Sequence, residues 1–381
     1  MCTIHRIITI GLWCVLLPWG RSLHAATFSF DLSSVPPIAQ PAFLEAGNIW
    51  GGILVSNVPI KVKVNWFPLG SGLLGITFPN GRRDFPAAPV AQTWYATALA
   101  NSIADMELNP GEKDIEVYLN ATTNWYYGLD AAPGPGQYDL VTVALHELGH
   151  GLGFVGLAKK VGTEGSFGTL LASDFAPLTT SFPWPQLDTL PGIFDRFLRN
   201  STPQFLVDLP NPSVLLGSAF TSNQIYWEGP HGLAGSIGSP VRMYAPATFA
   251  LGSSCVHLNE STYPAGNPNE LMTPNGTPGM ANHWPGPIAI GIMQDIGWTL
   301  MPGIGMDELD HKTIRIWPNP VQHVLNLEWS TPAMHLSITD AQGCLMWSGN
   351  GRPSIVVGHL AAGLYLLQVA GEAHPVRFIK N

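Results

Sequence analysis

The stretch Thr142-Val-Ala-Leu-His-Glu-Leu-Gly-His-Gly-Leu-Gly-Phe154 contains the pentad around which this 381-residue chain is organised. On a helix, side chains four residues apart lie on one face, so His146 and His150 can point toward the same ion. Neutral imidazoles suit zinc, and the adjacent Glu147 can accept the proton of a metal-activated water. The pentad is therefore an H-E-x-x-H motif and predicts a metal-dependent hydrolytic site.

The residues around the pentad favour a buried helix that stops shortly after it. An apolar face is formed at helical spacing by Val141, Val143, Ala144, Leu145, Leu148 and Leu152. Gly153 can adopt the positive φ that often follows the last helical turn, so we expect the helix to end there. The alternative interpretation is an ordinary buried helix whose two histidines are satisfied within the core.

A catalytic zinc site needs a third protein ligand as well as an open position. In metzincins the motif continues as H-E-x-x-H-x-x-G-x-x-H. This chain keeps the glycine as Gly153, but Gly156 stands where the third histidine is expected. The third ligand must come from further along the chain. The candidates are the histidines His231, His257 and His283 and the carboxylates Asp174, Asp195 and Glu228, although most carboxylates are simply surface residues.

One of these histidines has distinctive neighbours. His257-Leu-Asn-Glu260 is followed, after a short loop, by Asn269-Glu-Leu-Met-Thr-Pro274. Together with the pentad, this segment resembles the leishmanolysin family of metzincins, in which a long insertion separates the third histidine from the motif helix. The resemblance implies a metzincin-like zinc peptidase domain, with His257 as third zinc ligand and Met272 in the Met-turn beneath the metal. It does not extend to residues 157–256.

Residues 1–26 are interpreted as a secretory signal peptide. Arg6 supplies the positive charge, Ile7 to Leu17 the apolar core, and Ala25 and Ala26 the small residues of a cleavage site. The apolar run is short for a membrane span, although an N-terminal anchor is the alternative. We expect an exported mature chain without a stable membrane span, because no other stretch approaches that length.

The composition is typical of a loop-rich globular protein. Charged residues make up 11% of the chain, which contains 41 glycines, 34 prolines and 13 tryptophans. The formal net charge of −9 argues against nucleic acid as a partner. Cys2 and Cys14 would leave with the signal peptide, and Cys255 and Cys344 fall in different expected domains. A disulfide framework is therefore not expected, and Cys255 is interpreted as a buried thiol.

Residues 27–300 mix helical and strand patterns, and the fold class predicted for the chain is α+β. Helices are predicted over Pro41–Trp50 and Ala91–Met106, strands over Val58–Trp66 and Asp114–Asn120, and a final helix ending at Gly297. In metzincins, which this region resembles, the substrate pairs with a strand at the edge of the sheet. Residues 114–120 are the candidate for that edge.

Residues 301–312 lack periodicity and are interpreted as a linker to a second domain. From residue 313 to residue 381, about seven short alternating segments predict a small β-sandwich. The runs Trp317-Pro-Asn-Pro320, Asp340-Ala-Gln-Gly343, Gly363-Leu-Tyr365 and Arg377-Phe-Ile-Lys380 resemble the C-terminal sorting domain of the type IX secretion system of Bacteroidetes. The resemblance implies export through the periplasm to the cell surface or outside, with the secretion machinery as partner. The alternative is a carbohydrate- or surface-binding module.

These patterns together predict a secreted zinc-dependent endopeptidase that acts on a protein or peptide substrate. His146, His150 and His257 would hold Zn²⁺, and Glu147 would be the general base. One alternative is a surface-displayed adhesion or binding protein on a metalloprotease fold. The intact Glu147 argues against it, because such a protein would not need a general base. Another is a zinc hydrolase acting on a non-peptide bond, which the Met-turn context disfavours.

Overall fold

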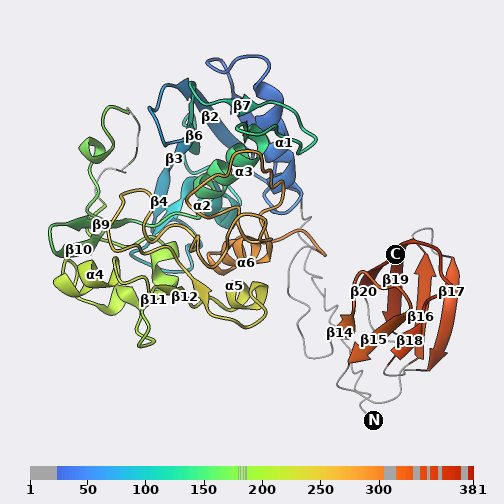
Figure 1. The fold of residues 1–381 in the computed structure, drawn as a ribbon. Helices are drawn as coiled ribbons and strands as arrows, with labels where there is room; N and C mark the ends of the chain where they lie inside the picture. The colour runs from blue at the N-terminus through green and yellow to red at the C-terminus, as the bar shows by residue number, and fades with distance from the viewer. Residues whose placement is uncertain are drawn as a thin grey trace, which may run out of the picture. The chain divides into compact units, whose positions relative to one another are not determined.

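The computed structural model describes residues 24–178, 180, 182, 184, 187–303, 315–328, 335–340, 344–350, 354–369 and 376–381. Residues 1–23 of the expected signal peptide and 304–312 of the expected linker lie outside the described residues, as do 313–314 and 341–343 of the expected sorting domain. The chain divides into two compact units, Met1–Gly305 and Met306–Asn381 (Figure 1).

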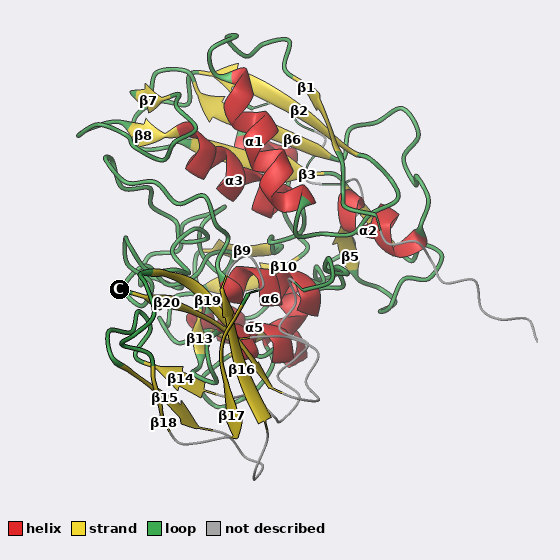
Figure 2. Ribbon diagram, turned by 90° about the vertical axis from the view of Figure 1, so that its right-hand side faces the viewer, coloured by secondary structure: helices red, strands yellow, loops and turns green. Residues whose placement is uncertain are grey.

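The N-terminal unit contains a four-stranded sheet covered on one face by helices. The strand order is β1 (Phe28–Asp31), β2 (Ile60–Phe67), β6 (Ile115–Asn120) and β3 (Gly75–Pro79). The first three strands are parallel, and β3 runs antiparallel to β6. Helices α1 (Gln40–Gly51) and α3 (Leu140–Gly151) lie side by side against the sheet (Figure 2). The indole of Trp50 fixes this pair, because its Nε1 donates to the carbonyl oxygen of Leu145 at 2.9 Å.

The predicted helix at 41–50 and the predicted strand at 58–66 are confirmed by α1 and β2. In β2 the buried residues Ile60, Val62 and Val64 alternate with half-buried ones, as the sequence pattern indicated. The helix predicted over 91–106 is only partly correct, since residues 94–96 form strand β5 and α2 covers Thr97–Ala104. Trp94 packs in a separate aromatic cluster and pairs with strand β4 (Gly81–Arg83), and this tertiary pairing overrides the helical pattern.

The prediction that residues 114–120 form the sheet edge is wrong. Strand β6 lies between β2 and β3, and all six of its residues are buried. The alternation that indicated a half-exposed strand comes from Glu116, whose carboxylate is buried and pairs with Lys113 at 2.7 Å. The edge on this side of the sheet is β3, a five-residue strand.

The remaining elements of the N-terminal unit are short. They are β7 (Trp125–Tyr126), β8 (Tyr138–Asp139), β9 (Ala158–Val161), β10 (Glu164–Phe167), β11 (Leu198–Arg199), β12 (Tyr226–Trp227), β13 (Val241–Arg242), α4 (Val214–Ala219), α5 (Pro230–Gly235), α6 (Pro287–Asp295) and the 3₁₀ turns η1 (Ala172–Phe175), η2 (Phe194–Phe197) and η3 (Leu206–Asp208). The predicted last helix is confirmed as α6, with Gly297 at a φ of +121° just beyond its end.

The C-terminal unit contains two antiparallel sheets around one apolar core. The described strands are β14 (Arg315–Trp317), β15 (Val324–Glu328), β16 (His335–Asp340), β17 (Leu345–Asn350), β18 (Ser354–Val356), β19 (Gly363–Val369) and β20 (Val376–Lys380). The sheet orders are β14-β15-β18 and β17-β16-β19-β20. Leu325 and Ile355 of one sheet share the core with Ile338 and Phe378 of the other. The prediction of a β domain is confirmed, and the mixed helix and strand content of the chain fits the predicted α+β class.

Candidate metal centre

Helix α3 carries the pentad, and both of its ends are fixed by local chemistry. Asp139 caps the first turn, since its Oδ1 accepts from the backbone N–H of Thr142 at 2.7 Å. After the last residue, Gly151, the chain turns at Gly153, whose φ of +119° favours glycine, as predicted. The helix therefore begins at a capped first turn and ends shortly before a turn that favours glycine.

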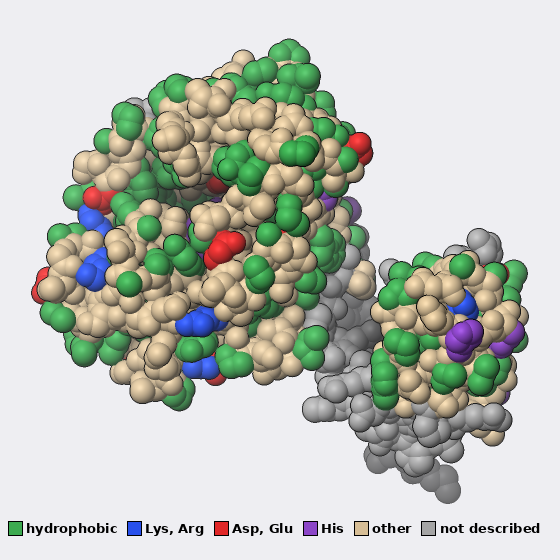
Figure 3. Space-filling model, in the orientation of Figure 1, with side chains coloured by type: hydrophobic (Ala, Val, Ile, Leu, Met, Phe, Trp, Pro, Cys, Tyr) green, Lys and Arg blue, Asp and Glu red, His purple; other side chains and the backbone are tan. Residues whose placement is uncertain are grey.

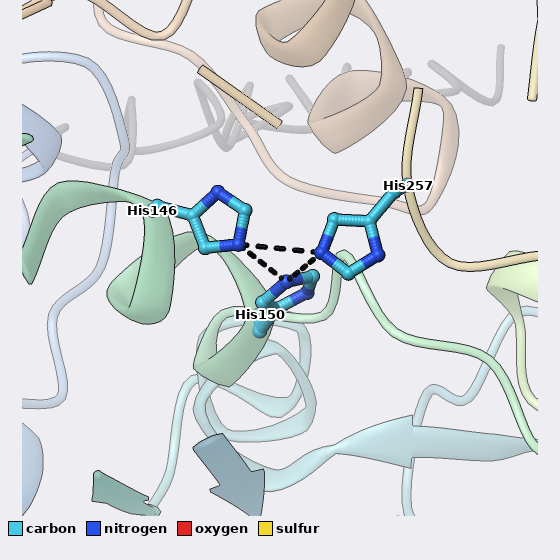
Figure 4. A group of neighbouring side chains, drawn as sticks. All are labelled: His146, His150 and His257. Atoms are coloured by element: carbon cyan, nitrogen blue, oxygen red, sulfur yellow. Dashed lines mark hydrogen bonds between the residues drawn. The ribbon is translucent and has the colours of Figure 1, made fainter. Parts of the chain in front are cut away.

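Three histidines from two distant parts of the chain converge at one point. The Nε2 atoms of His146 and His150 are 3.0 Å apart, and that of His257 lies 3.1 Å from His150 and 3.3 Å from His146 (Figure 4). Within the described residues, these three form the group of histidine, cysteine and acidic side chains placed to hold a metal ion. The structure thus brings together the residues that the sequence motif and the family resemblance named separately.

The other ring nitrogen of each histidine is bonded to a backbone carbonyl oxygen. Nδ1 of His146 bonds to Leu271, that of His150 to Phe154 and that of His257 to Ser253, at 2.6, 2.6 and 2.9 Å. A carbonyl oxygen only accepts, so each Nδ1 must carry the ring proton. Each Nε2 is therefore unprotonated and presents a lone pair toward the other two Nε2 atoms. Three converging lone pairs are the arrangement expected of metal ligands oriented by outer hydrogen bonds.

The surroundings keep the three imidazoles neutral. Burial lowers the pKa of His146 and lowers that of His257 to about 3. Burial and the two neighbouring imidazoles place the pKa of His150 well below its ordinary value. Neutral imidazole is the form that binds a metal, so the cluster needs no deprotonation at neutral pH.

The spacing of the cluster suits a small tetrahedral ion. Nitrogen ligands about 2.0–2.1 Å from a tetrahedral zinc ion lie about 3.3 Å from one another. The observed separations of 3.0–3.3 Å come close to that value. Met272, which the leishmanolysin resemblance assigns to the Met-turn, is buried against the motif helix, where a Cβ added to Gly149 would lie 2.9 Å from its Sδ. The residues present therefore fit a zinc ion.

The other candidate ligands lie outside the histidine cluster. His283 hydrogen-bonds through Nε2 to Asp139 at 2.8 Å, and His231 lies in α5, outside the group of three. Asp174 pairs with Lys159 at 2.6 Å, Glu228 pairs with Arg199, and Asp195 accepts from the backbone N–H groups of Leu157 and Gly192. Cys255 is a buried free thiol, as interpreted, and Cys344 is free and exposed.

Gly156 marks the point where this chain departs from the uninterrupted metzincin motif, and the packing explains why a histidine is absent there. A Cβ added to Gly156 would lie 2.3 Å from Oδ1 of Asp195, which is fully buried. A side chain at this position would displace that carboxylate from its backbone donors. The third imidazole reaches the cluster from His257 instead.

Asp195 should make the stability of the fold depend on pH. Burial raises its pKa from 3.8 to about 7, against the opposing effects of its backbone donors and Arg196. Between these two values the folded state holds a proton that the unfolded chain has released, so stability falls as pH rises from about 4 to about 7. The loss is on the order of 4 kcal/mol for a shift of this size. Thermal unfolding of Asp195→Asn should show a shallower fall across this range, and equal slopes would contradict the assignment.

Glu147 lies beside the histidines with its side chain almost fully buried. Burial raises its pKa to about 7, while a hydrogen bond from Thr77 lowers it. The Thr77 hydroxyl donates to Oε2 at 2.6 Å. The sequence did not indicate a role for Thr77. Its only signal was the short alternating run Ile76-Thr77-Phe78, which forms the middle of β3.

The cluster opens onto a cleft of about 760 Å³. Its lining includes β3, the three histidines, Glu147 and a wall formed by residues 273–277 and 280–282. The face of the N-terminal unit in Figure 3 is visibly hollowed. The site is therefore accessible to a ligand larger than water.

Comparison with known families identifies two segments. A family model described as SPBPB7E8-like matches residues 92–165, which include the pentad, and the model of the secretion system C-terminal sorting domain matches residues 315–380. None of the curated proteins matches the chain. The second match shows that the chain is exported by type IX secretion to the cell surface or outside and interacts with that machinery. In the part of the chain that the structure describes, no helix combines the length and apolar character needed to cross a membrane.

Proposed function

We propose that the N-terminal unit is a zinc-dependent endopeptidase with a metzincin-like fold. The observation that carries the proposal is the convergence of three imidazole lone pairs beside a buried carboxylate at the floor of an open cleft. The sorting domain supports an extracellular setting for such an activity.

The proposed roles follow from the donor set. His146, His150 and His257 would hold the ion through Nε2, and a bound zinc supplies a Lewis acid that activates water and withdraws charge from a carbonyl oxygen. Glu147 accepts a proton from the attacking water and later delivers it to the leaving amine nitrogen. The backbone carbonyls of Leu271, Phe154 and Ser253 keep the imidazoles oriented throughout.

An extended peptide is the substrate that suits the cleft. Strand β3 is an edge strand, and on the side away from β6 its backbone groups can pair with another strand. The same strand lines the cleft and contacts Glu147. An extended chain paired with β3 would bring its carbonyl groups close to the base, which favours peptide hydrolysis over other hydrolytic reactions.

Removing the metal should abolish the activity reversibly. Cleavage of an unfolded protein by the mature chain is expected to fall at least about 100-fold after treatment with 1,10-phenanthroline, because water loses its activating ion. Addition of stoichiometric zinc should restore the rate. Cleavage that survives complete zinc removal would contradict the proposal. Zinc bound without cleavage of any protein substrate would favour the binding protein or the non-peptide hydrolase.

A further inference from the structure

Strand β3 touches Glu147 with two residues on the same face. Gly75 and Thr77 are two apart in the strand, so both face helix α3. Thr77 donates its hydroxyl to Oε2 of Glu147 at 2.6 Å. Gly75 lies against the other oxygen, since a Cβ added there would be 2.5 Å from Oε1. The strand therefore binds one oxygen of the carboxylate and leaves space for the other.

We propose that Thr77 is a positioning residue that holds Glu147 in its reactive orientation, an inference that rests on the proposed peptidase function. A glutamate has three rotatable side-chain bonds, and a buried carboxylate without a donor would turn toward any polar group within reach. The hydroxyl of Thr77 binds Oε2 and leaves Oε1 to accept the proton of water. The bare Cα of Gly75 provides the space in which Oε1 lies.

The position of the hydroxyl is set by the sheet. Thr77 pairs with Val117 of β6, in the middle of a ladder that runs from Gly75 to Pro79. Its β-branched side chain has few rotamers, so a fixed backbone also fixes the hydroxyl. Because β3 is also the edge strand, a peptide paired with it would be in register with the residue that orients the base. Strand β3 would then align both the substrate and Glu147.

The test compares Thr77→Val, which keeps the shape and removes the hydroxyl, with Thr77→Ser, which keeps the hydroxyl. Thr27→Val, at an exposed position just before β1 at the other edge of the sheet, is the control. Thr77→Val is expected to lower kcat roughly 10- to 100-fold, a typical cost of misplacing a catalytic group, with KM and zinc content unchanged. Thr77→Ser and Thr27→Val should stay near the wild-type kcat.

Crystal structures of the same variants give a readout that does not depend on turnover. The carboxylate of Glu147 should leave its position on β3 in Thr77→Val and keep it in Thr77→Ser. A wild-type kcat in Thr77→Val, or an unmoved carboxylate, would overturn the inference. Equal losses of kcat in the Val and Ser variants would also overturn it, because they would reflect packing alone. If the wild type itself cleaves nothing, the peptidase proposal fails, and the crystal structures still decide whether Thr77 orients Glu147.

Discussion

Glu147→Gln is expected to lose about 100- to 10,000-fold in peptide cleavage, the usual contribution of a general base, while zinc stays bound. Glutamine has nearly the same shape, and its amide oxygen can still accept the Thr77 hydroxyl bond that Oε2 accepts now. It cannot take a proton from water at neutral pH. The histidine cluster should be unaffected, because its imidazoles are oriented by backbone carbonyls.

The measurement pairs initial cleavage rates with zinc content for the wild type and the variant. Glu164→Gln is a suitable control, since Glu164 is an exposed carboxylate of β10 outside the lining of the cleft, and the turnover should remain. Turnover of Glu147→Gln at the wild-type rate would show that another group accepts the proton. A loss of zinc together with activity would instead assign Glu147 a structural part in the centre.

The motif helix could be predicted from sequence because its information is local. The spacing of His146 and His150, the apolar face and Gly153 all lie within one short segment, and α3 follows them closely. The C-terminal strands were readable for the same reason, since their alternation is local and the structure reproduces it. His257 needed the family resemblance, because it lies 107 residues beyond His150 and no local pattern connects them.

The edge of the sheet could not be predicted in this way. Glu116 gives β6 the alternation of a half-exposed strand. Its carboxylate nevertheless pairs with Lys113, and β6 lies between β2 and β3. Which strand lies at the edge depends on where β3 joins the sheet. Strand β3 has five residues and ends in Pro79, so its sequence gives little indication of a strand. The contact between Thr77 and Glu147 depends on the position of β3 in the sheet, and therefore only the structure reveals it.

His257→Ala is expected to lower zinc affinity by at least about 100-fold, so that the purified variant contains little metal. The remaining ligands, His146 and His150, both lie on α3, and two imidazoles alone do not complete a three-ligand site. His283→Ala is the matched control. Its imidazole bonds to Asp139 at the start of α3, outside the cluster, so zinc content should be unchanged.

Thermal stability separates loss of a ligand from loss of the fold. A metal that binds only the folded state stabilises it by RT ln(1 + [Zn]/Kd), so added zinc should raise Tm in the wild type and in His283→Ala. In His257→Ala the apo Tm should be near that of the apo wild type, but zinc should no longer raise it. Full zinc occupancy in His257→Ala would require another third ligand. Loss of zinc from both variants would mean that the cap at Asp139 governs the cluster, since His283 bonds to the carboxylate that caps the motif helix.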